Sequence, residues 1–204
     1  MLRSRGDVLL LMLTVALWAQ DKPASSSKPL SHTKASAPDS GAISNGIYRN
    51  SAFGISYKLP YGWVDRTAEM QDDSADASSS RLLLAVFERP PEATGDSVNS
   101  AVVIAAEPLP NGMKTTAEYF ESLSALATGR GFEVKEGPSE LSVGATKLVR
   151  GDFSKARGTL TMYQASLVTL QKGYAVSFTF IGGSEDEVNE LIEKLSFASR
   201  KPAR

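Results

Sequence analysis

The side chains that most often perform catalysis are scarce in this 204-residue sequence. It contains no cysteine and a single histidine, His32, which stands in a Ser-, Ala- and Pro-rich stretch near the N-terminus. A Ser-His-Asp triad, a Cys-His pair and a histidine-ligated zinc ion all need a histidine or a thiol inside a folded domain. The sequence therefore argues against these catalytic centres, and it excludes disulfides and lipid attachment through cysteine.

Carboxylates are the remaining candidates for acid–base chemistry, which needs two carboxyl groups that converge on one substrate. Four carboxylates lie in or near predicted strands: Asp65, Glu88, Glu107 and Asp152. Strand ends carry such residues routinely, and nothing in the spacing of these four indicates convergence. We therefore predict no catalytic residue and no cofactor.

Two glycine-containing stretches have some features of phosphate loops. GGSEDE, Gly182 to Glu187, precedes a helical pattern, but its three acidic residues occupy the positive end of the helix dipole and would repel a phosphate. NGMKTT, Asn111 to Thr116, lacks the G-x-x-x-x-G-K-S/T spacing of a nucleotide loop. We interpret the first stretch as a helix cap and predict no phosphate site in either.

A surface for a partner or ligand is predicted from one acidic stretch and one aromatic residue. QDDSADASSS contains Asp72, Asp73 and Asp76, whose oxygens are of the kind that calcium prefers, but it lacks the turn glycine and the distal glutamate of a calcium loop. A solvated loop is therefore favoured, and no metal is predicted. Tyr61 stands at the tip of a Pro-Tyr-Gly turn and is expected to be exposed.

The stretch FGISYKLPYGW around this turn contains four aromatic residues, Phe53, Tyr57, Tyr61 and Trp63, and one proline, Pro60. Phe53, Ile55, Tyr57 and Leu59 alternate with small or polar residues, which is the period of a half-buried strand. Pro60 and Gly62 fit a type I turn that directs Trp63 back over the strand end. We expect Phe53, Tyr57 and Trp63 to close one end of the core rather than line a ligand site.

These residues must be positioned by a sheet and its covering helices. RLLLAVFE, 81–88, and SAVVIAAE, 100–107, are continuous apolar runs and predict central strands that are buried on both faces. Further strands are predicted at Glu133 to Lys135, Thr146 to Phe153, Thr159 to Leu170 and the segment YAVSFTFI.

Two helices are predicted from their N-terminal signals. Thr115 and Glu118 form a capping box before a helical pattern that glycines end near 129–131. Ser184 and Glu187 form a second capping box before an apolar stripe at helical spacing. Helices that bracket a run of strands predict an α+β fold, an α/β/α sandwich with a mostly antiparallel sheet flanked by helices.

The chain divides into segments of different composition. A basic start, an apolar run from Val8 to Leu17 and Ala19 are typical of an export signal, because a spanning helix needs about 20 apolar residues. An uncleaved N-terminal membrane anchor stays open as the alternative. The predicted segments are a signal peptide (1–19), a disordered Ser/Ala/Pro/Lys linker (20–45), the α/β domain (46–199) and a basic tail (200–204).

Three stretches resemble the PsbP-like family, whose α/β/α sandwich is shared with the Ran-binding nucleotide-release factor. They are the opening FGISYKLPYGW, the mid-chain TTAEYFESL and the ending GYAVSFTFIGGSEDEVNELIEKLSF. The resemblance covers about residues 46–199 and consists of strand and helix patterns, so no functional residue carries over by motif. It implies a non-enzymatic exported accessory or binding module.

Function is thus expected from surfaces and not from a catalytic centre. With 22 basic and 23 acidic side chains and a net charge of -1, the chain has no excess of basic residues that could bind the phosphates of a nucleic acid. We expect an envelope protein partner, no stable membrane span, and a periplasmic or extracellular location. The alternative is a small-ligand or lipid carrier with a pocket between sheet and helix. The sequence indicates no oligomeric state.

Overall fold

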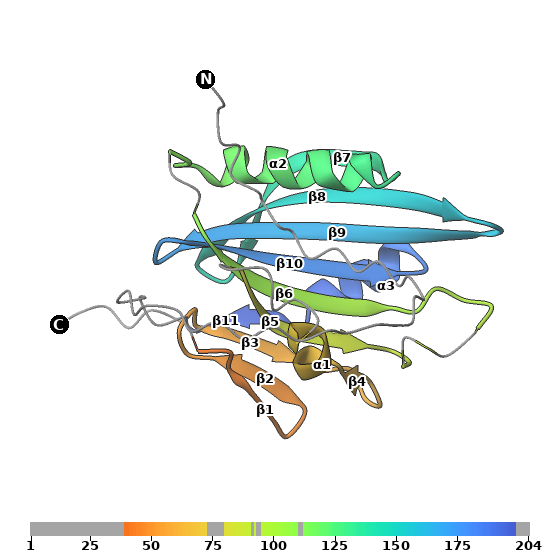
Figure 1. Ribbon diagram of the computed structural model, residues 1–204, viewed down its shortest axis with the longest axis horizontal. Coiled ribbons are helices and arrows are strands. Elements are labelled where there is room, and N and C mark those ends of the chain that lie inside the picture. The colour runs from red at the N-terminus through yellow and green to blue at the C-terminus, as the bar shows by residue number, and fades with distance from the viewer. Residues whose placement is uncertain (1–38, 73–79, 91, 93–94, 110–111, 199–204) are drawn as a thin grey trace, which may run out of the picture.

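The computed structural model describes residues 39–72, 80–90, 92, 95–109 and 112–198. The described chain forms two antiparallel sheets and three helices, which confirms the predicted α+β class (Figure 1). The seven-stranded sheet has the order β4 (Val64–Asp65), β5 (Arg81–Phe87), β6 (Ala101–Pro108), β10 (Tyr174–Gly182), β9 (Leu160–Gln171), β8 (Thr146–Arg157) and β7 (Glu133–Val143). The four-stranded sheet has the order β1 (Ala42–Ser44), β2 (Ile47–Asn50), β3 (Ile55–Lys58) and β11 (Leu195–Phe197). The helices are α1 (Thr67–Asp72), α2 (Thr116–Gly129) and α3 (Glu185–Ile192).

The two faces of the seven-stranded sheet are covered by different elements. Val176, Phe178 and Phe180 of β10 face the main core, which the four-stranded sheet and α3 close from the other side. The intervening residues of β10 point to the opposite face, where Ala175 packs under α2 and Ile181 lies beside the smaller cluster under α1. The sheet is therefore the middle layer of a three-layer sandwich, and the predicted central strands β5 and β6 are buried as expected.

Helix α2 begins and ends where the sequence predicts. Thr115 accepts a hydrogen bond from the backbone N–H of Glu118, whose carboxylate accepts one from the backbone N–H of Thr115, so the capping box is complete. The helix then lays Phe120 directly on Gly151 of β8, where a Cβ atom would come within 2.4 Å of the ring. The missing side chain at position 151 is what allows the helix to lie this close to the sheet.

Helix α3 has a different N-terminus from the predicted one. Ser184 does accept from the backbone N–H of Glu187. The Glu187 carboxylate, however, accepts from the backbone N–H of Gly183 and from the hydroxyl of Ser100 instead of closing a second capping box. The carboxylate thus fastens the helix start to the beginning of β6, a contact between residues that lie far apart in the sequence.

The aromatic stretch divides between core and surface. Phe53 and Tyr57 are buried in the main core, as predicted. Trp63 packs against the same core, as predicted, but its ring is only partly buried, so it covers the end of the core without being enclosed by it. Trp63 directly precedes β4, a two-residue strand at the edge of the large sheet, and side chains at a sheet edge have fewer neighbours to cover them.

Several elements depart from the sequence prediction, among them β2, β4 and β11, which form where no strand is predicted. β1 lies inside the range 20–45 that the sequence assigns to the linker, and it pairs with β2 through a turn at Asn45 and Gly46, both at positive φ. α1 forms where no helix is predicted. β7 continues to Val143 through Gly137 and Pro138, since it is an edge strand with register shifts that tolerate a residue without an N–H.

Candidate functional site

The turn between β3 and β4 presents an aromatic side chain to solvent. The side chain of Tyr61 is fully exposed, whereas Leu59 and Trp63 on either side of it pack against the main core. The backbone N–H of Leu59 donates to the carbonyl of Gly46 at 2.8 Å, which ties the turn to the β1–β2 hairpin. The turn is therefore anchored on both sides of the exposed ring.

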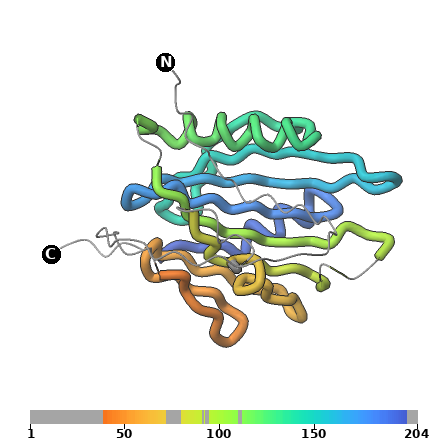
Figure 2. The backbone as a smooth tube through the Cα atoms, viewed as in Figure 1, coloured from red at the N-terminus to blue at the C-terminus, as the bar shows by residue number. Residues whose placement is uncertain are grey.

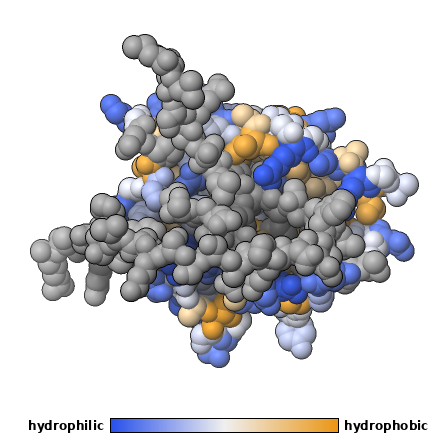
Figure 3. Space-filling view, viewed as in Figure 1, coloured by the Kyte–Doolittle hydropathy of each residue, from blue (hydrophilic) through white to orange (hydrophobic). Residues whose placement is uncertain are grey.

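The neighbouring hairpin adds apolar surface to the same edge of the molecule. Both turns project from the lower edge of the backbone trace (Figure 2), and the space-filling view has hydrophobic residues along that edge among polar ones (Figure 3). Ile43 of β1 is among the large apolar side chains that the described chain leaves exposed. We call Ile43 and Leu59–Trp63 the aromatic turn surface.

The other residues of the predicted partner surface are not placed beside Tyr61 by the structure. Asp72 is the last residue of α1. Asp73 and Asp76 lie outside the described residues. Within the described part of the chain, no group of three or more histidine, aspartate or glutamate side chains could hold a metal ion. A role of these aspartates in binding stays a prediction.

The four strand-associated carboxylates do not converge. Asp65 accepts hydrogen bonds from the backbone N–H and the hydroxyl of Thr67 at the start of α1. Glu88 is exposed after the end of β5. Asp152 accepts two hydrogen bonds from the Arg150 guanidinium, and the same guanidinium donates to Asn189 of α3. Since Asp152 lies toward α3, it is separated by the sheet from Glu107, which lies toward α2.

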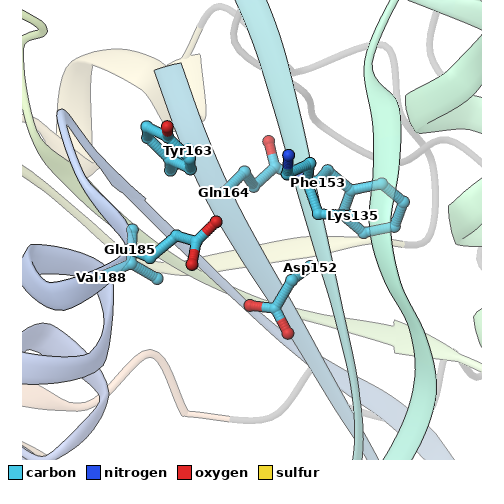
Figure 4. A pocket seen from close by; sticks show the side chains of 7 residues that line it. All are labelled: Lys135, Asp152, Phe153, Tyr163, Gln164, Glu185 and Val188. Atoms are coloured by element: carbon cyan, nitrogen blue, oxygen red, sulfur yellow. The ribbon is translucent and has the colours of Figure 1, made fainter. Parts of the chain in front are cut away.

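A shallow hollow of about 10 Å³, open to solvent, lies beside the N-terminus of α3. Figure 4 shows the carboxylates of Asp152 and Glu185 directed toward the same space, between Tyr163 and Lys135. Asp152 is already neutralised by its bidentate pair with Arg150. The arrangement stabilises the contact of α3 with the sheet and offers no second carboxylate that is free for acid–base chemistry.

Glu107 is the one buried carboxylate of the described chain, with only 7% of its surface exposed. One of its oxygens, Oε2, accepts a hydrogen bond from the Tyr119 hydroxyl at 2.9 Å. Burial raises the pKa of Glu107, and the hydrogen bond from Tyr119 opposes that rise. Burial, and after it the contact with Glu107, raises the pKa of Tyr119. The pair joins the first turn of α2 to the end of β6. In the sequence, the only feature that indicates this pair is the charged residue Glu107 at the end of an apolar run.

Replacing Glu107 with glutamine is expected to stabilise the protein at neutral pH. The folded-state pKa lies above the ordinary value of 4.5, so ionisation of this carboxyl costs folding free energy. In the parent, that cost is absent below the ordinary pKa, grows as the pH rises toward the folded-state pKa, and is complete above it. Thermal melts of parent and Glu107→Gln between pH 4 and 8, values set by the usual Glu range, measure the difference.

The variant Glu140→Gln serves as the control, because Glu140 is an exposed carboxylate paired with Lys147. It should follow the parent across the whole pH range, since exposed pairs contribute little. A Glu107→Gln protein that is less stable than the parent at neutral pH, or equally stable at every pH, would show that ionised Glu107 is not costly in the fold.

Comparisons with known proteins bear on the fold. No family model and no curated protein matches the sequence. Among solved structures, the chain is similar to the cyanobacterial PsbP protein (CyanoP) of Synechocystis sp. PCC 6803, with 12% identity, a TM-score of 0.50, and coverage of 78% of this chain and 96% of that one. It also aligns with LpqN of Mycobacterium tuberculosis, described as involved in cell envelope biogenesis, at 13% identity and a TM-score of 0.41, covering 71% and 83% of the two chains. The chain has a PsbP-like fold. In the described residues, no helix is long and apolar enough to cross a membrane.

Proposed function

We propose that this protein is a non-enzymatic binding module of the cell envelope, exported to the periplasm or the cell exterior, that docks on a protein partner through the aromatic turn surface. The observation that carries the proposal is the complete exposure of Tyr61 on a turn whose flanking residues are packed. The export pattern of residues 1–19 supports the location.

The anchoring of the turn favours recognition. Tyrosine is enriched at protein interfaces, since its ring buries a large area and has few rotatable bonds to order. The Leu59 to Gly46 hydrogen bond and the packing of Trp63 hold the backbone on both sides of Tyr61, so docking would immobilise little more than one side chain. Ile43 of β1, two strands from β3 in the small sheet, adds a second exposed apolar side chain.

The proposal is tested by affinity capture from envelope extract with the full chain immobilised. We expect one stoichiometric partner to be retained by the parent and by Tyr61→Phe, and to be lost from Tyr61→Ala. Val134→Ala is the matched control, because Val134 is an exposed apolar residue on β7, away from the turn. Melting temperatures of all variants should agree within a few degrees, since Tyr61 makes no core contact.

Two results would overturn the proposal. Retention of the partner by Tyr61→Ala at parental yield would mean that docking uses another surface. Failure of the parent to retain any stoichiometric protein from extract of its own envelope would remove the basis for a docking module.

A further inference from the structure

The hairpin formed by β8 and β9 extends past the rest of the large sheet. The pairing of β7 reaches only to Ser154 of β8, and the pairing of β10 reaches only to Tyr163 of β9. β8 and β9 continue to pair with each other as far as Arg157 and Leu160. We call residues 155–162 the arm, which forms the right-hand end of the sheet in Figure 1. Neither outer edge of the arm is paired with another strand of the described chain.

The arm stands in solvent without a covering layer. Its residues 156–159 and Thr161 are exposed, and Leu160 and Met162 are partly exposed. Gly158, at a φ of 63°, makes the turn and fits the first central position of a type II′ hairpin. A two-stranded hairpin is only marginally stable by itself in water, and free strand edges are sites where other chains attach. The arm is therefore a candidate for contact with another molecule.

The charge of the arm is entirely positive. Lys155 and Arg157 are its charged residues, and the stretch KARGTLTM contains no acidic side chain. The Lys155 amine donates to the carbonyl of Arg130 after the end of α2 and lies 5.5 Å from the centre of the Phe132 ring. Arg157 is two residues further along the strand and so points to the same face of the sheet. It forms no ion pair with a residue that the structure describes.

The solvent face of α3 carries the opposite charge. The exposed acidic residues of this helix and of the position that follows it are Glu185, Asp186, Glu190 and Glu193. None of the four forms an ion pair with a described residue. We call these four residues the acidic face of α3. Because α3 packs on the sheet face opposite to α2, the cations of the arm point away from the acidic face of their own chain.

The two charged surfaces nevertheless lie at the same end of the molecule. Tyr163 at the base of the arm and Glu185 at the start of α3 line the same hollow (Figure 4). A two-fold rotation can therefore place the arm of one copy against α3 of a second copy and repeat the contact in the other direction. Pairing of two arms with each other would bring like charges together, which is unfavourable between neighbouring strands.

We propose that two copies of this protein associate through this end, with the arm of each copy lying on the acidic face of α3 in the other. Arg157 and Lys155 supply the positive side of each contact, and Leu160 and Met162, which pair with them across the arm, add apolar surface. The interface uses other elements than the aromatic turn surface. A partner protein could therefore dock on each copy of the pair.

The test is sedimentation velocity of the full chain in a concentration series, at about 0.05 M salt and at about 1 M salt, where charges are screened within about 3 Å. We expect a monomer–dimer equilibrium that weakens at high salt. Arg157→Glu should weaken the dimer at least about tenfold, because the two-fold axis places each repulsive contact in the interface twice. Arg49→Glu is the matched control and should associate like the parent, since Arg49 is an exposed arginine of β2 in the other sheet.

A charge swap identifies the second copy as the partner. The variant Glu190→Lys/Glu193→Lys reverses two charges near the end of α3, where cations are compatible with the helix dipole. This variant and Arg157→Glu should each be largely monomeric alone and should form a dimer when mixed, because every contact in the mixed pair joins opposite charges. All substituted residues are exposed, so the melting temperatures should agree within a few degrees.

Three results would overturn the proposal. A parent chain that stays monomeric at low salt would show that the arm has no partner in a second copy. Dimerisation of Arg157→Glu at parental strength would place the interface elsewhere. Failure of the two variants to associate on mixing would show that the arm does not meet the acidic face of α3.

Discussion

Replacing Tyr57 with alanine is expected to lower the free energy of unfolding by about 3 to 5 kcal/mol, the usual range for emptying a large aromatic site. Tyr57 has 0% of its surface exposed and packs its ring 6.2 Å from that of Phe180. Its hydroxyl also donates to the backbone carbonyl of Leu191, at the end of α3. The substitution removes the ring that joins the four-stranded sheet to the large sheet, and it removes one of the two hydrogen bonds that the Leu191 carbonyl accepts, the other coming from the backbone N–H of Lys194.

The neighbouring aromatic residues make matched comparisons. Trp63→Ala should cost about 1 to 3 kcal/mol, because part of that ring is already in water. Tyr61→Ala should change stability by less than about 0.5 kcal/mol, as exposed substitutions do. Chemical denaturation of the three variants, with fitted slopes compared for a common two-state transition, measures the order. If Trp63→Ala cost as much as Tyr57→Ala, the ring at 63 would be a full core residue after all.

A methyl group added at Gly151 is expected to destabilise the protein by about 1 to 3 kcal/mol through overpacking. The Cβ atom of Gly151→Ala would lie 2.4 Å from one ring carbon of Phe120 and 2.9 Å from another. Either α2 must move away from the sheet or the Phe120 ring must leave its rotamer. Gly137→Ala on β7 is the control, because a Cβ atom there meets nothing within 4 Å.

A double-mutant cycle tests the mechanism of that effect. Phe120→Leu shortens the side chain that meets position 151, so Gly151→Ala should cost less in that background, with a coupling of about 0.5 to 3 kcal/mol. Denaturant unfolding of the four proteins supplies the free energies. Additive costs would show that the glycine matters for its backbone conformation and not for the contact with Phe120.

Some elements were predicted from the sequence because their signals are local. The cap at Thr115, the apolar runs of β5 and β6 and the alternation from Phe53 to Tyr57 each depend on residues within one or two turns or along one strand. In other elements, pairing with a neighbouring strand overrides the local sequence pattern. Gly137 and Pro138 are strong breakers in isolation, but pairing with β8 extends β7 past them because the free edge needs no N–H from proline.

The candidate sites follow the same division. That Tyr61 would stand at a turn tip could be predicted from Pro60 and Gly62. How far Trp63 is buried could not be predicted, because it depends on the place of the neighbouring strand β4 at the edge of the large sheet. The pair of Glu107 and Tyr119 was also beyond sequence reasoning, because the two side chains meet only once α2 is packed on the large sheet.

The sequence by itself determined the class of fold, the paucity of catalytic side chains and the faces of the strands, because alternation, capping and composition act over a few residues. Tertiary structure alone decided which carboxylate is buried and how far the ring of Trp63 is covered. These properties depend on pairing and packing between segments far apart in the chain, as with Glu187 and Ser100 or Tyr57 and Leu191. Local patterns specify which side of an element is apolar, but the distance between elements is set by the side chains that meet across them, such as Phe120 on Gly151.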